Sequence, residues 1–319
     1  MSGTPTPPAL PLRDGTLPTA ELIDLYMGHY AGRDPALAAR LRWWVGRVGP
    51  MPFESVTDDH VHAALEDLAR MPARYFAGID ADGRRIFKPK PGGKPMSAAS
   101  VNRHHQALAS VFTWAIKRRI APKGWLNPCR SVDKRSEAGS ARARYLTDAE
   151  RDRLLAACKG TTWPKLYLLV LLALSTGARK GELMGLRWAD VDLPARLAHV
   201  ARSKNGDAKA LPLVPAAVDE LLRFRGAADV LVFGSTKAPG SPFNFTPAWS
   251  AALKAAHIRG FRFHDLRHSC ASFLAKNGAT LLEIADLLGH RQISMTRRYS
   301  HLAASHRSAL VDRVMGELR

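Results

Sequence analysis

The chain has 319 residues, of which 46% are hydrophobic and 24% are charged, values typical of a globular protein. This composition excludes a disordered or fibrous chain, and at roughly 100 to 200 residues per domain it indicates two domains. Lysine and arginine outnumber aspartate and glutamate by 47 to 28, which gives a net charge of +19. Such an excess favours a polyanionic partner, most often nucleic acid, although ribosomal and membrane-surface proteins share it.

Cysteine usage and apolar runs narrow the cellular compartment in which the protein is expected to act. The three cysteines, Cys129, Cys158 and Cys270, are odd in number and lack a CxxC spacing, so we expect no disulfide framework, no cysteine-based zinc site and a reducing cytoplasm. The longest apolar run, residues 166–174, is nine residues long, against the roughly 20 that a membrane-spanning helix needs. Residues 1–18 have no signal-peptide pattern and are expected to form a disordered tail.

Residues 19–128 are expected to form a helical domain. Helices are predicted from Thr19 to Tyr30, from an N-cap at Asp34 to about Gly49, after Thr57, and from Ser97 to about Arg118. Between the last two, residues 78–96 contain Gly, Pro and five basic residues, a pattern typical of either a basic β-hairpin or a mobile loop. On the last helix, Asn102, Arg103 and Gln106 form a polar face.

The composition changes after Asn127-Pro128. Residues 129–145 are rich in Ser, Ala, Gly and basic residues and are expected to form an exposed linker to a second domain, residues 146–319. There, a capping box at Thr147 opens a helix, residues 163–175 form a buried central helix, and Asn205-Gly206 predicts a two-stranded hairpin within residues 197–214. Further helices are predicted at residues 215–224, 247–257, 264–276, 280–288 and 294–302, with an amphipathic tail helix at about 305–318.

The fold class expected from these elements is mainly α with a small β-sheet. The second domain also carries polar residues that packing explains poorly: Arg179, Lys204, His264, Arg267, His290 and Tyr299. Two guanidiniums, two imidazoles, an ammonium and a phenol without a nearby pair of acids suit the stabilisation of a pentavalent phosphoryl transition state without metal.

The order and spacing of these residues resemble the tyrosine recombinase (phage integrase) family. Residues 146–302 contain T-G-x-R-x-x-E-L, a hairpin lysine, H-x-L-R-H, L-G-H and Y-x-H, in that order. The preceding helical segment is similar to that family's core-binding domain. The resemblance implies a four-helix core-type DNA-binding domain followed by a mixed α/β catalytic domain. The departures are the lack of an arm-binding domain ahead of residue 19 and the length of segment 78–96.

The resemblance also implies a role for each residue. Tyr299 would be the nucleophile, Lys204 the general acid for the leaving 5′ oxygen, and His264 would handle the tyrosine proton. Glu182 would orient Arg179. The non-bridging phosphate oxygens would be bound by Arg179, Arg267 and His290, and DNA-binding candidates on the first domain are Asn102, Arg103 and Gln106.

The implied function is a site-specific DNA recombinase of a mobile element, acting through a covalent 3′-phosphotyrosine without metal, nucleotide or other cofactor. The implied partners are double-stranded DNA and copies of the chain, as a dimer on a site and a tetramer in the synapse. An accessory DNA-bending or directionality protein is a further candidate. The implied location of the protein is the cytoplasm, in association with the nucleoid. The tail helix, with Ala309, Leu310, Val314 and Leu318 at helical spacing, would dock in trans; a helix folded back in cis is the alternative.

Other interpretations stay open at this stage. A type IB topoisomerase would use the same chemistry to relax DNA, and a non-catalytic DNA-binding regulator would need only the basic surface. His264, His268, His290 and His301 offer a metal cluster as an alternative to phosphate binding, although no carboxylate accompanies the i, i+4 pair. Lys209 lies close enough to Lys204 to compete for its role.

Overall fold

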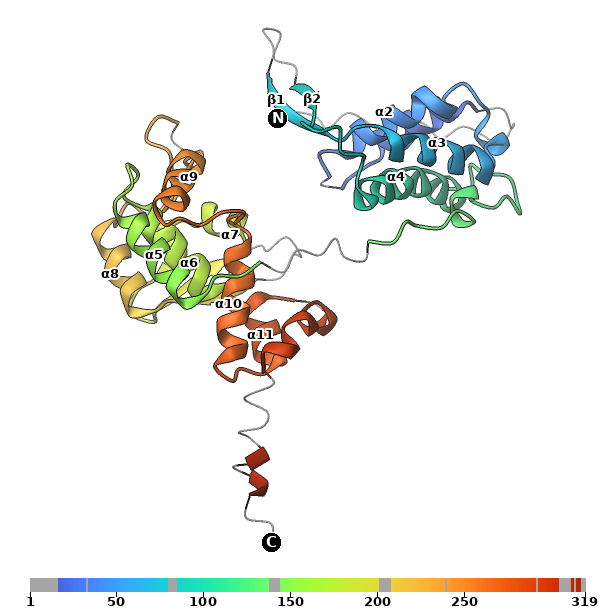
Figure 1. Cartoon of the computed structure of the whole chain (residues 1–319). Helices are drawn as coiled ribbons and strands as arrows, with labels where there is room; N and C mark the ends of the chain where they lie inside the picture. The colour runs from blue at the N-terminus through green and yellow to red at the C-terminus, as the bar shows by residue number, and fades with distance from the viewer. Residues whose placement is uncertain are drawn as a thin grey trace. The chain divides into compact units, whose positions relative to one another are not determined.

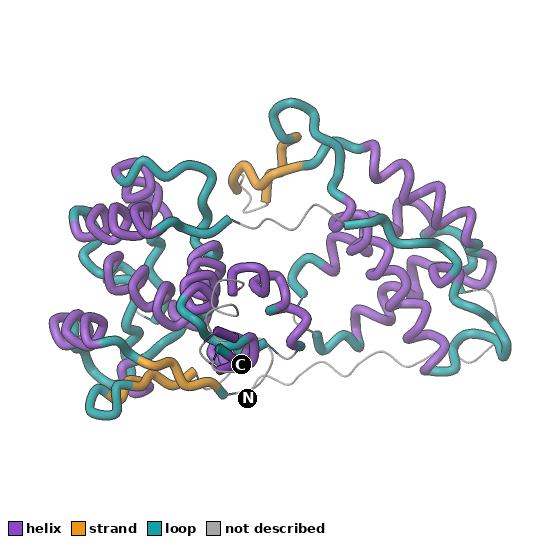
Figure 2. The backbone as a smooth tube through the Cα atoms, turned by 60° about the horizontal axis from the view of Figure 1, so that its bottom comes forward, coloured by secondary structure: helices purple, strands orange, loops and turns teal. Residues whose placement is uncertain are grey.

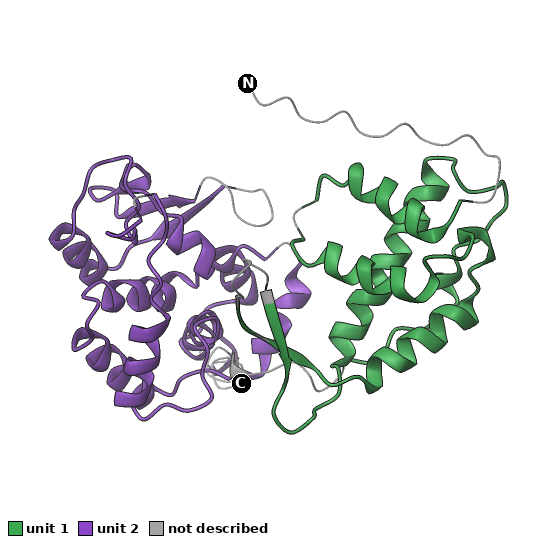
Figure 3. Ribbon diagram, turned by 90° about the horizontal axis from the view of Figure 1, so that it is seen from above, with its two compact units in different colours: residues 1–141 green, residues 142–319 purple. Residues whose placement is uncertain are grey.

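The computed structural model describes residues 17–32, 34–79, 85–137, 144–200, 208–238, 240–290, 292–303, 311–312 and 314–316. The chain divides into two compact units, residues 1–141 and 142–319, which are described separately (Figure 3). Within the described ranges the protein is mainly helical with small antiparallel sheets, which confirms the expected fold class. In the same ranges, no helix has the length and apolar character of a membrane span.

The first unit buries one face of each of its helices, which are α1 (Thr19–Gly28), α2 (Leu37–Val48), α3 (Asp58–Arg70) and α4 (Ala98–Lys117) (Figure 1). On α2 the buried residues recur at helical spacing: Leu37, Leu41, Trp44 and Val48. Trp44 is fully buried, and its indole Nε1 donates a hydrogen bond of 2.8 Å to the His104 carbonyl of α4. A core aromatic side chain thus joins α2 to α4 through packing and a polar contact.

The start of α2 differs from the expectation. The helix begins at Leu37 rather than directly after Asp34-Pro35. The Asp34 carboxylate accepts a hydrogen bond of 3.0 Å from the Ala36 N–H and pairs with Arg40 at 2.5 Å. The Asp34 side chain, which the sequence predicted to cap the helix, instead closes a turn that precedes it.

The basic segment between α3 and α4 forms the hairpin that was one of the two alternatives. Strands β1 (Arg74–Ile79) and β2 (Arg85–Pro89) pair antiparallel, with a bulge between Phe76 and Gly78 (Figure 2). Gly78 has a φ of +144°, which favours glycine at this irregularity.

The predicted linker, residues 129–145, begins with contacts to α4, although most of residues 130–137 are exposed. Cys129 is buried in a short 3-10 helix, Pro128–Arg130, and its carbonyl lies 2.8 Å from Nε2 of His105 on α4. Further along, the Arg135 N–H and carbonyl both bond the side-chain amide of Asn102, at 2.9 Å each. The Ser/Ala/Gly composition concealed these backbone contacts, which depend on acceptors and donors supplied by α4.

The second unit is arranged around the apolar helix α6 (Leu166–Thr176), most of which is buried. Helices α5 (Asp148–Lys159), α8 (Pro215–Arg223) and α10 (Asp265–Lys276) pack against α6. Helix α9 (Thr246–Ala255) packs on α5, and α11 (Leu281–Leu288) packs on α10. The short helix α7 (Lys180–Met184) follows α6 after three residues.

A three-stranded sheet in the order β3-β4-β5 contains the predicted hairpin strands β4 (Leu197–Val200) and β5 (Lys209–Pro212). Strand β3 (Val191–Asp192) adds a third strand that the sequence pattern did not predict, because two residues show no alternation. The hairpin tip, residues 201–207, lies outside the described residues.

The predicted helix at residues 294–302 is a pair of 3-10 segments, Ile293–Met295 and Arg297–Ala303. Of the predicted tail helix, only residues 311–312 and 314–316 are described, and Val311 and Val314 are exposed there. Ala309, Leu310 and Leu318 lie outside the described residues.

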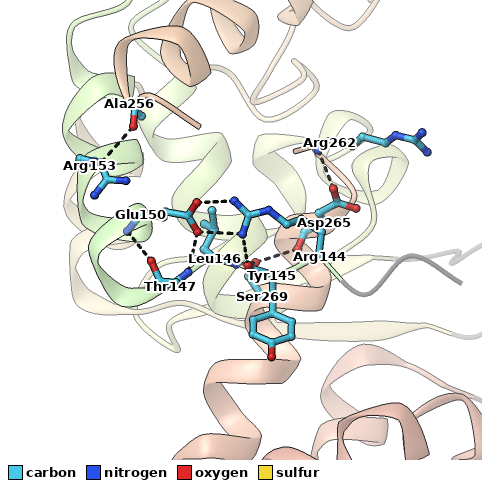
Figure 4. A network of polar contacts seen from close by, with 10 residues as sticks. All are labelled: Arg144, Tyr145, Leu146, Thr147, Glu150, Arg153, Ala256, Arg262, Asp265 and Ser269. Carbon is cyan, nitrogen blue, oxygen red and sulfur yellow. Dashed lines mark hydrogen bonds and ion pairs between the residues drawn. The ribbon is translucent and has the colours of Figure 1, made fainter. Parts of the chain in front are cut away.

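A polar network fastens the start of the second unit to α10 (Figure 4). Arg144 pairs with Glu150, whose carboxylate also accepts the Thr147 N–H at 3.0 Å. The adjacent Leu146 N–H donates to Ser269 Oγ of α10 at 2.9 Å. This network matters because α10 carries three of the candidate site residues.

Replacing Glu150 by Gln should lower the free energy of unfolding of this unit by about 1 to 2 kcal/mol at pH 7, since it removes a partly exposed ion pair and weakens a cap. The Arg144 guanidinium lowers the pKa of Glu150 from 4.5 to about 2. The stabilisation is therefore complete above pH 4.5 and is lost as the pH falls towards 2. Urea denaturation of both proteins from pH 7 to pH 3 measures this, and a difference that does not shrink in acid would contradict it.

Candidate active site

The junction of α6 and α7 places Arg179. Helix α6 ends at Gly177, whose φ of +61° is a left-handed cap. A Cβ at this glycine would lie 2.2 Å from Leu288 Cδ2, so a side chain here would require Leu288 to shift, and the left-handed φ adds backbone strain. Two residues later, the Glu182 carboxylate accepts the Arg179 N–H at 2.9 Å and pairs with its Nη1 at 2.7 Å. Glu182 thus orients the Arg179 guanidinium at the first turn of α7, the contact that its predicted role requires.

Arg267 lies on α10, one turn after His264, and is only 5% exposed. Its Nη1 donates a hydrogen bond of 2.7 Å to the Gly177 carbonyl, and no ion pair neutralises it among the described residues. Burial and the like charge of Arg179 lower the pKa of Arg267 to about 10. The guanidinium is still charged at pH 7, so this buried cation is held ready for an anion from outside the chain.

His290 follows α11 and its left-handed cap Gly289. Its Nδ1 lies 2.8 Å from the buried Thr296 Oγ1. Burial together with Arg267 and Arg179 lowers the pKa of His290 to about 4, so the imidazole is neutral at pH 7. When the Thr296 hydroxyl donates to Nδ1, the ring proton is on Nε2, where it can donate to a phosphate oxygen.

Tyr299 is 4% exposed and packs against Ala271, Ala275, Ile284 and Leu288. Its hydroxyl lies 2.6 Å from Nδ1 of His268. Burial raises the pKa of Tyr299 even though Arg298 and Arg267 act in the opposite direction. In the free protein, desolvation outweighs the effect of the two cations, and the phenol is protonated.

The candidate residues line one cavity of about 230 Å³ in the second unit. It brings together residues of four segments: the N-cap of α7, helix α10, the end of α11 and the segment 292–303. Its lining comprises Arg179, His264, Arg267, His268, His290, Met295, Arg298 and Tyr299. Five of the residues singled out in the sequence thus converge, and the added residues make the lining still more basic. Within the described ranges, no group of three His, Cys, Asp or Glu could hold a metal ion.

His268 has a contact that the sequence did not assign to it. The sequence named His268 only as a member of the histidine cluster, while His264 was assigned the tyrosine proton. In the structure the two rings are 5.5 Å apart, and it is His268 that contacts the Tyr299 hydroxyl. Burial and the neighbouring His264 lower the pKa of His268, so its imidazole is neutral at pH 7 and can accept a proton. The signal available in the sequence was the i, i+4 spacing of the pair.

Lys204 lies outside the described residues, but its competitor Lys209 does not. Lys209 begins β5 and lines a second groove of about 960 Å³, together with Arg179 and His290. Its Nζ is buried and has no hydrogen-bond partner among the described residues. Burial lowers the pKa of Lys209 to about 8, with Arg267 and Arg179 acting in the same direction.

The three DNA-binding candidates on α4 separate into two kinds. Asn102 is buried, and its amide is occupied by the Arg135 backbone and by Glu137 at 2.8 Å. In this structure the Asn102 side chain holds the segment after Cys129 on α4, so its amide is occupied. Arg103 and Gln106 are exposed, and Lys134 donates to Gln106 Oε1 at 3.3 Å.

Comparison with known proteins gives the class. A family model described as the phage integrase family matches residues 144–306. The integrase of Salmonella phage P22 is 30% identical over 283 residues, which cover 84% of this chain and 71% of that protein. The shufflon-specific DNA recombinase of Escherichia coli is 33% identical over 222 residues, covering 66% of this chain and 53% of that protein.

Solved structures share the fold. The Tn1549 transposon integrase in complex with a circular intermediate DNA has a TM-score of 0.68 and 18% identity, covering 93% of this chain and 100% of that chain. A lambda integrase dimer bound to a COC′ core site has a TM-score of 0.64 and 20% identity, covering 91% and 79%. The chain belongs to the phage integrase family, the tyrosine recombinases, and is a site-specific DNA recombinase. The topoisomerase and regulator alternatives are not favoured.

His268→Asn should slow formation of a covalent DNA adduct by about 10²-fold or more, because the Asn amide can hold the Tyr299 hydroxyl but cannot accept its proton. His264→Asn, the matched change one turn away, should slow it less. Single-turnover cleavage of a nicked suicide substrate between pH 6 and 9 compares the two. A larger loss for His264→Asn would restore the assignment made from sequence.

Proposed function

We propose that the second unit cleaves and rejoins DNA through a covalent bond between Tyr299 and the 3′-phosphate. The observation that carries this proposal is the cavity that brings the Tyr299 hydroxyl together with Arg179, Arg267 and His290. Cations and a hydrogen-bond donor around one phenol match the charge that develops on a phosphoryl group under attack.

In this mechanism the phenol oxygen of Tyr299 attacks phosphorus and loses its proton to His268. The bond between phosphorus and the 5′ oxygen breaks, and Lys204 supplies a proton to that oxygen. Arg179, Arg267 and His290 hold the two non-bridging oxygens, and these groups supply the charge stabilisation without metal or other cofactor. Rejoining is the reverse attack by a 5′ hydroxyl, and the phosphotyrosine bond conserves the energy of the broken linkage, so no nucleotide is consumed.

Ionising a phenol of pKa about 10 at pH 7 costs roughly 4 kcal/mol, and burial of Tyr299 makes the cost larger. Transfer of the proton to His268 as the bond to phosphorus forms avoids a free phenolate. The bound phosphate also brings the anion that Arg179 and Arg267 lack in the free protein. Both effects tie activation of the nucleophile to the arrival of DNA.

Double-stranded DNA is the substrate that this chemistry requires, and the net charge of +19 supports it. Two related structures add a possible assembly: a lambda integrase dimer on a core site and a lambda integrase tetramer on a Holliday junction. We propose the same states for this chain, acting at the nucleoid, with a tail that docks on a neighbouring copy. An accessory DNA-bending or directionality protein is part of the same proposal.

Tyr299→Phe should bind DNA with nearly unchanged affinity and form no covalent adduct, because it removes only the nucleophilic oxygen. Denaturing gels after incubation with a nicked suicide substrate show the adduct, and gel-shift titration gives the affinity. Trapping of the variant on the DNA would place the nucleophile elsewhere.

Lys204→Ala should slow cleavage by several orders of magnitude on ordinary DNA and far less on DNA with sulfur in place of the scissile 5′ oxygen, because a thiolate leaves without a proton. Lys209→Ala should slow cleavage of both substrates to a similar extent, since its buried charge acts on the arginine site. Selective rescue of Lys209→Ala by the sulfur substrate would make Lys209 the acid.

Truncation after Ala304 should leave a protein that binds a single half-site normally but loses cooperative binding to a full site and recombination, because a closed ring of identical subunits needs a contact between two different surfaces. Gel-shift titration on half and full sites measures both. Unchanged cooperativity would favour a tail folded back in cis.

A further inference from the structure

The β1–β2 hairpin of the first unit carries an unusual surface. Of the six large apolar side chains that are exposed in the described part of this unit, four lie on the hairpin and its base: Met71, Tyr75, Ile86 and Phe87. Tyr75 is 42% exposed and Phe87 44%. A two-stranded hairpin on its own is at best marginally stable in water. Exposed apolar side chains on such a hairpin therefore indicate a surface that another molecule covers.

The hairpin is also basic. The described residues 71–79 and 85–96 include five Lys or Arg and no Asp or Glu, and the whole segment 74–94 has six basic and two acidic residues. Lys88, Lys90 and Lys94 have no ion pair among the described residues. This charge disfavours a second copy of the same hairpin and complements the phosphates of DNA.

Register places apolar and basic groups on one face. Tyr75 pairs directly with Lys88, so the two side chains share a face of the ladder, and Ile86 lies on that face two residues before Lys88. A phenol and an aliphatic side chain beside an ammonium can contact the bases or sugars of a groove and its phosphate edge. A two-stranded ribbon has the width that the major groove of B-DNA admits.

The base of the hairpin is held firmly. The Ala73 N–H donates to the Lys94 carbonyl at 2.8 Å, the Lys90 N–H donates to the Ala73 carbonyl at 2.7 Å, and the Met96 N–H donates to the Met71 carbonyl at 3.0 Å. These bonds join the end of α3 to the start of α4, from which the two strands stand away (Figure 1). The exposed Arg103 and Gln106 follow within the first three turns of α4.

We propose that the β1–β2 hairpin is a DNA-binding element of the first unit, which enters the major groove with the face that carries Tyr75, Ile86 and Lys88. The proposal rests on the proposed function of the chain and adds a contact outside the catalytic unit. The lysines bind the phosphates that border the groove, and the apolar side chains lie against its wall.

The first test is the salt dependence of binding to a random-sequence duplex of about 40 base pairs, roughly four helical turns. Each lost phosphate contact reduces the slope of log affinity against log salt by about 0.9, so Lys88→Ala with Lys90→Ala should reduce it by about 2. The matched control is Lys117→Ala, at the last residue of α4, with Lys123→Ala just beyond it; α4 is about 30 Å long and begins beside the hairpin base. This control should leave the slope unchanged. Equal slopes for the hairpin variant and the wild type would overturn the proposal.

The second test identifies the molecule that covers this face of the hairpin. The photo-crosslinking residue p-benzoylphenylalanine, placed at position 75 in the full-length chain, should attach the protein to labelled duplex on irradiation. Crosslinking to a second copy of the chain, or to nothing, would overturn the proposal. Covalent adduct formation by the wild type on a nicked suicide substrate reports separately on the proposed function, so the hairpin proposal can fail while that function stands.

Discussion

The catalytic unit depends on keeping like charges together in a buried place. Arg267 is almost fully buried beside Arg179, and burial together with both arginines lowers the pKa values of Lys209 and His290. The protein offsets this repulsion with one buried carboxylate, Glu182, and with the carbonyl of Gly177. Neither compensates for all of the positive charge. On the proposed mechanism a phosphodiester supplies the missing anion, so substrate binding would make this charged site more favourable.

Rigidity for this arrangement comes from the apolar helix α6, against which α10 packs, and from the polar network at Leu146 and Ser269. The proposed nucleophile belongs to a different kind of structure. Tyr299 lies in a 3-10 segment after α11, buried and protonated, with its hydroxyl on His268. On the proposed mechanism, the free protein would combine a charged, preformed phosphate site with a nucleophile whose reactivity is suppressed, which would limit attack on water or on misplaced phosphates.

Sequence reasoning predicted much of this because the relevant signals are local. The apolar stretch of α6 and the capping box at Thr147 each follow from neighbouring residues. Residues far apart in sequence were harder. The contact of His268 with Tyr299 spans 31 positions, and Asn102 bonds to a segment 33 residues away, so no periodicity shows either. Predicting them requires knowing which faces of α10 and α4 meet other parts of the chain.

Gly177 shows how closely the motif depends on packing. It performs no chemistry, yet its carbonyl binds Arg267, its backbone turns the chain towards Arg179, and its missing side chain leaves room for Leu288 of the helix that precedes His290. The hydrogen atom that glycine has in place of a side chain therefore helps to set the separation of Arg179, Arg267 and His290, the three groups that we propose to bind phosphate. The glycine in T-G-x-R acts as a spacer: a larger residue at this position would shift all three groups at once, although every one of them remained present.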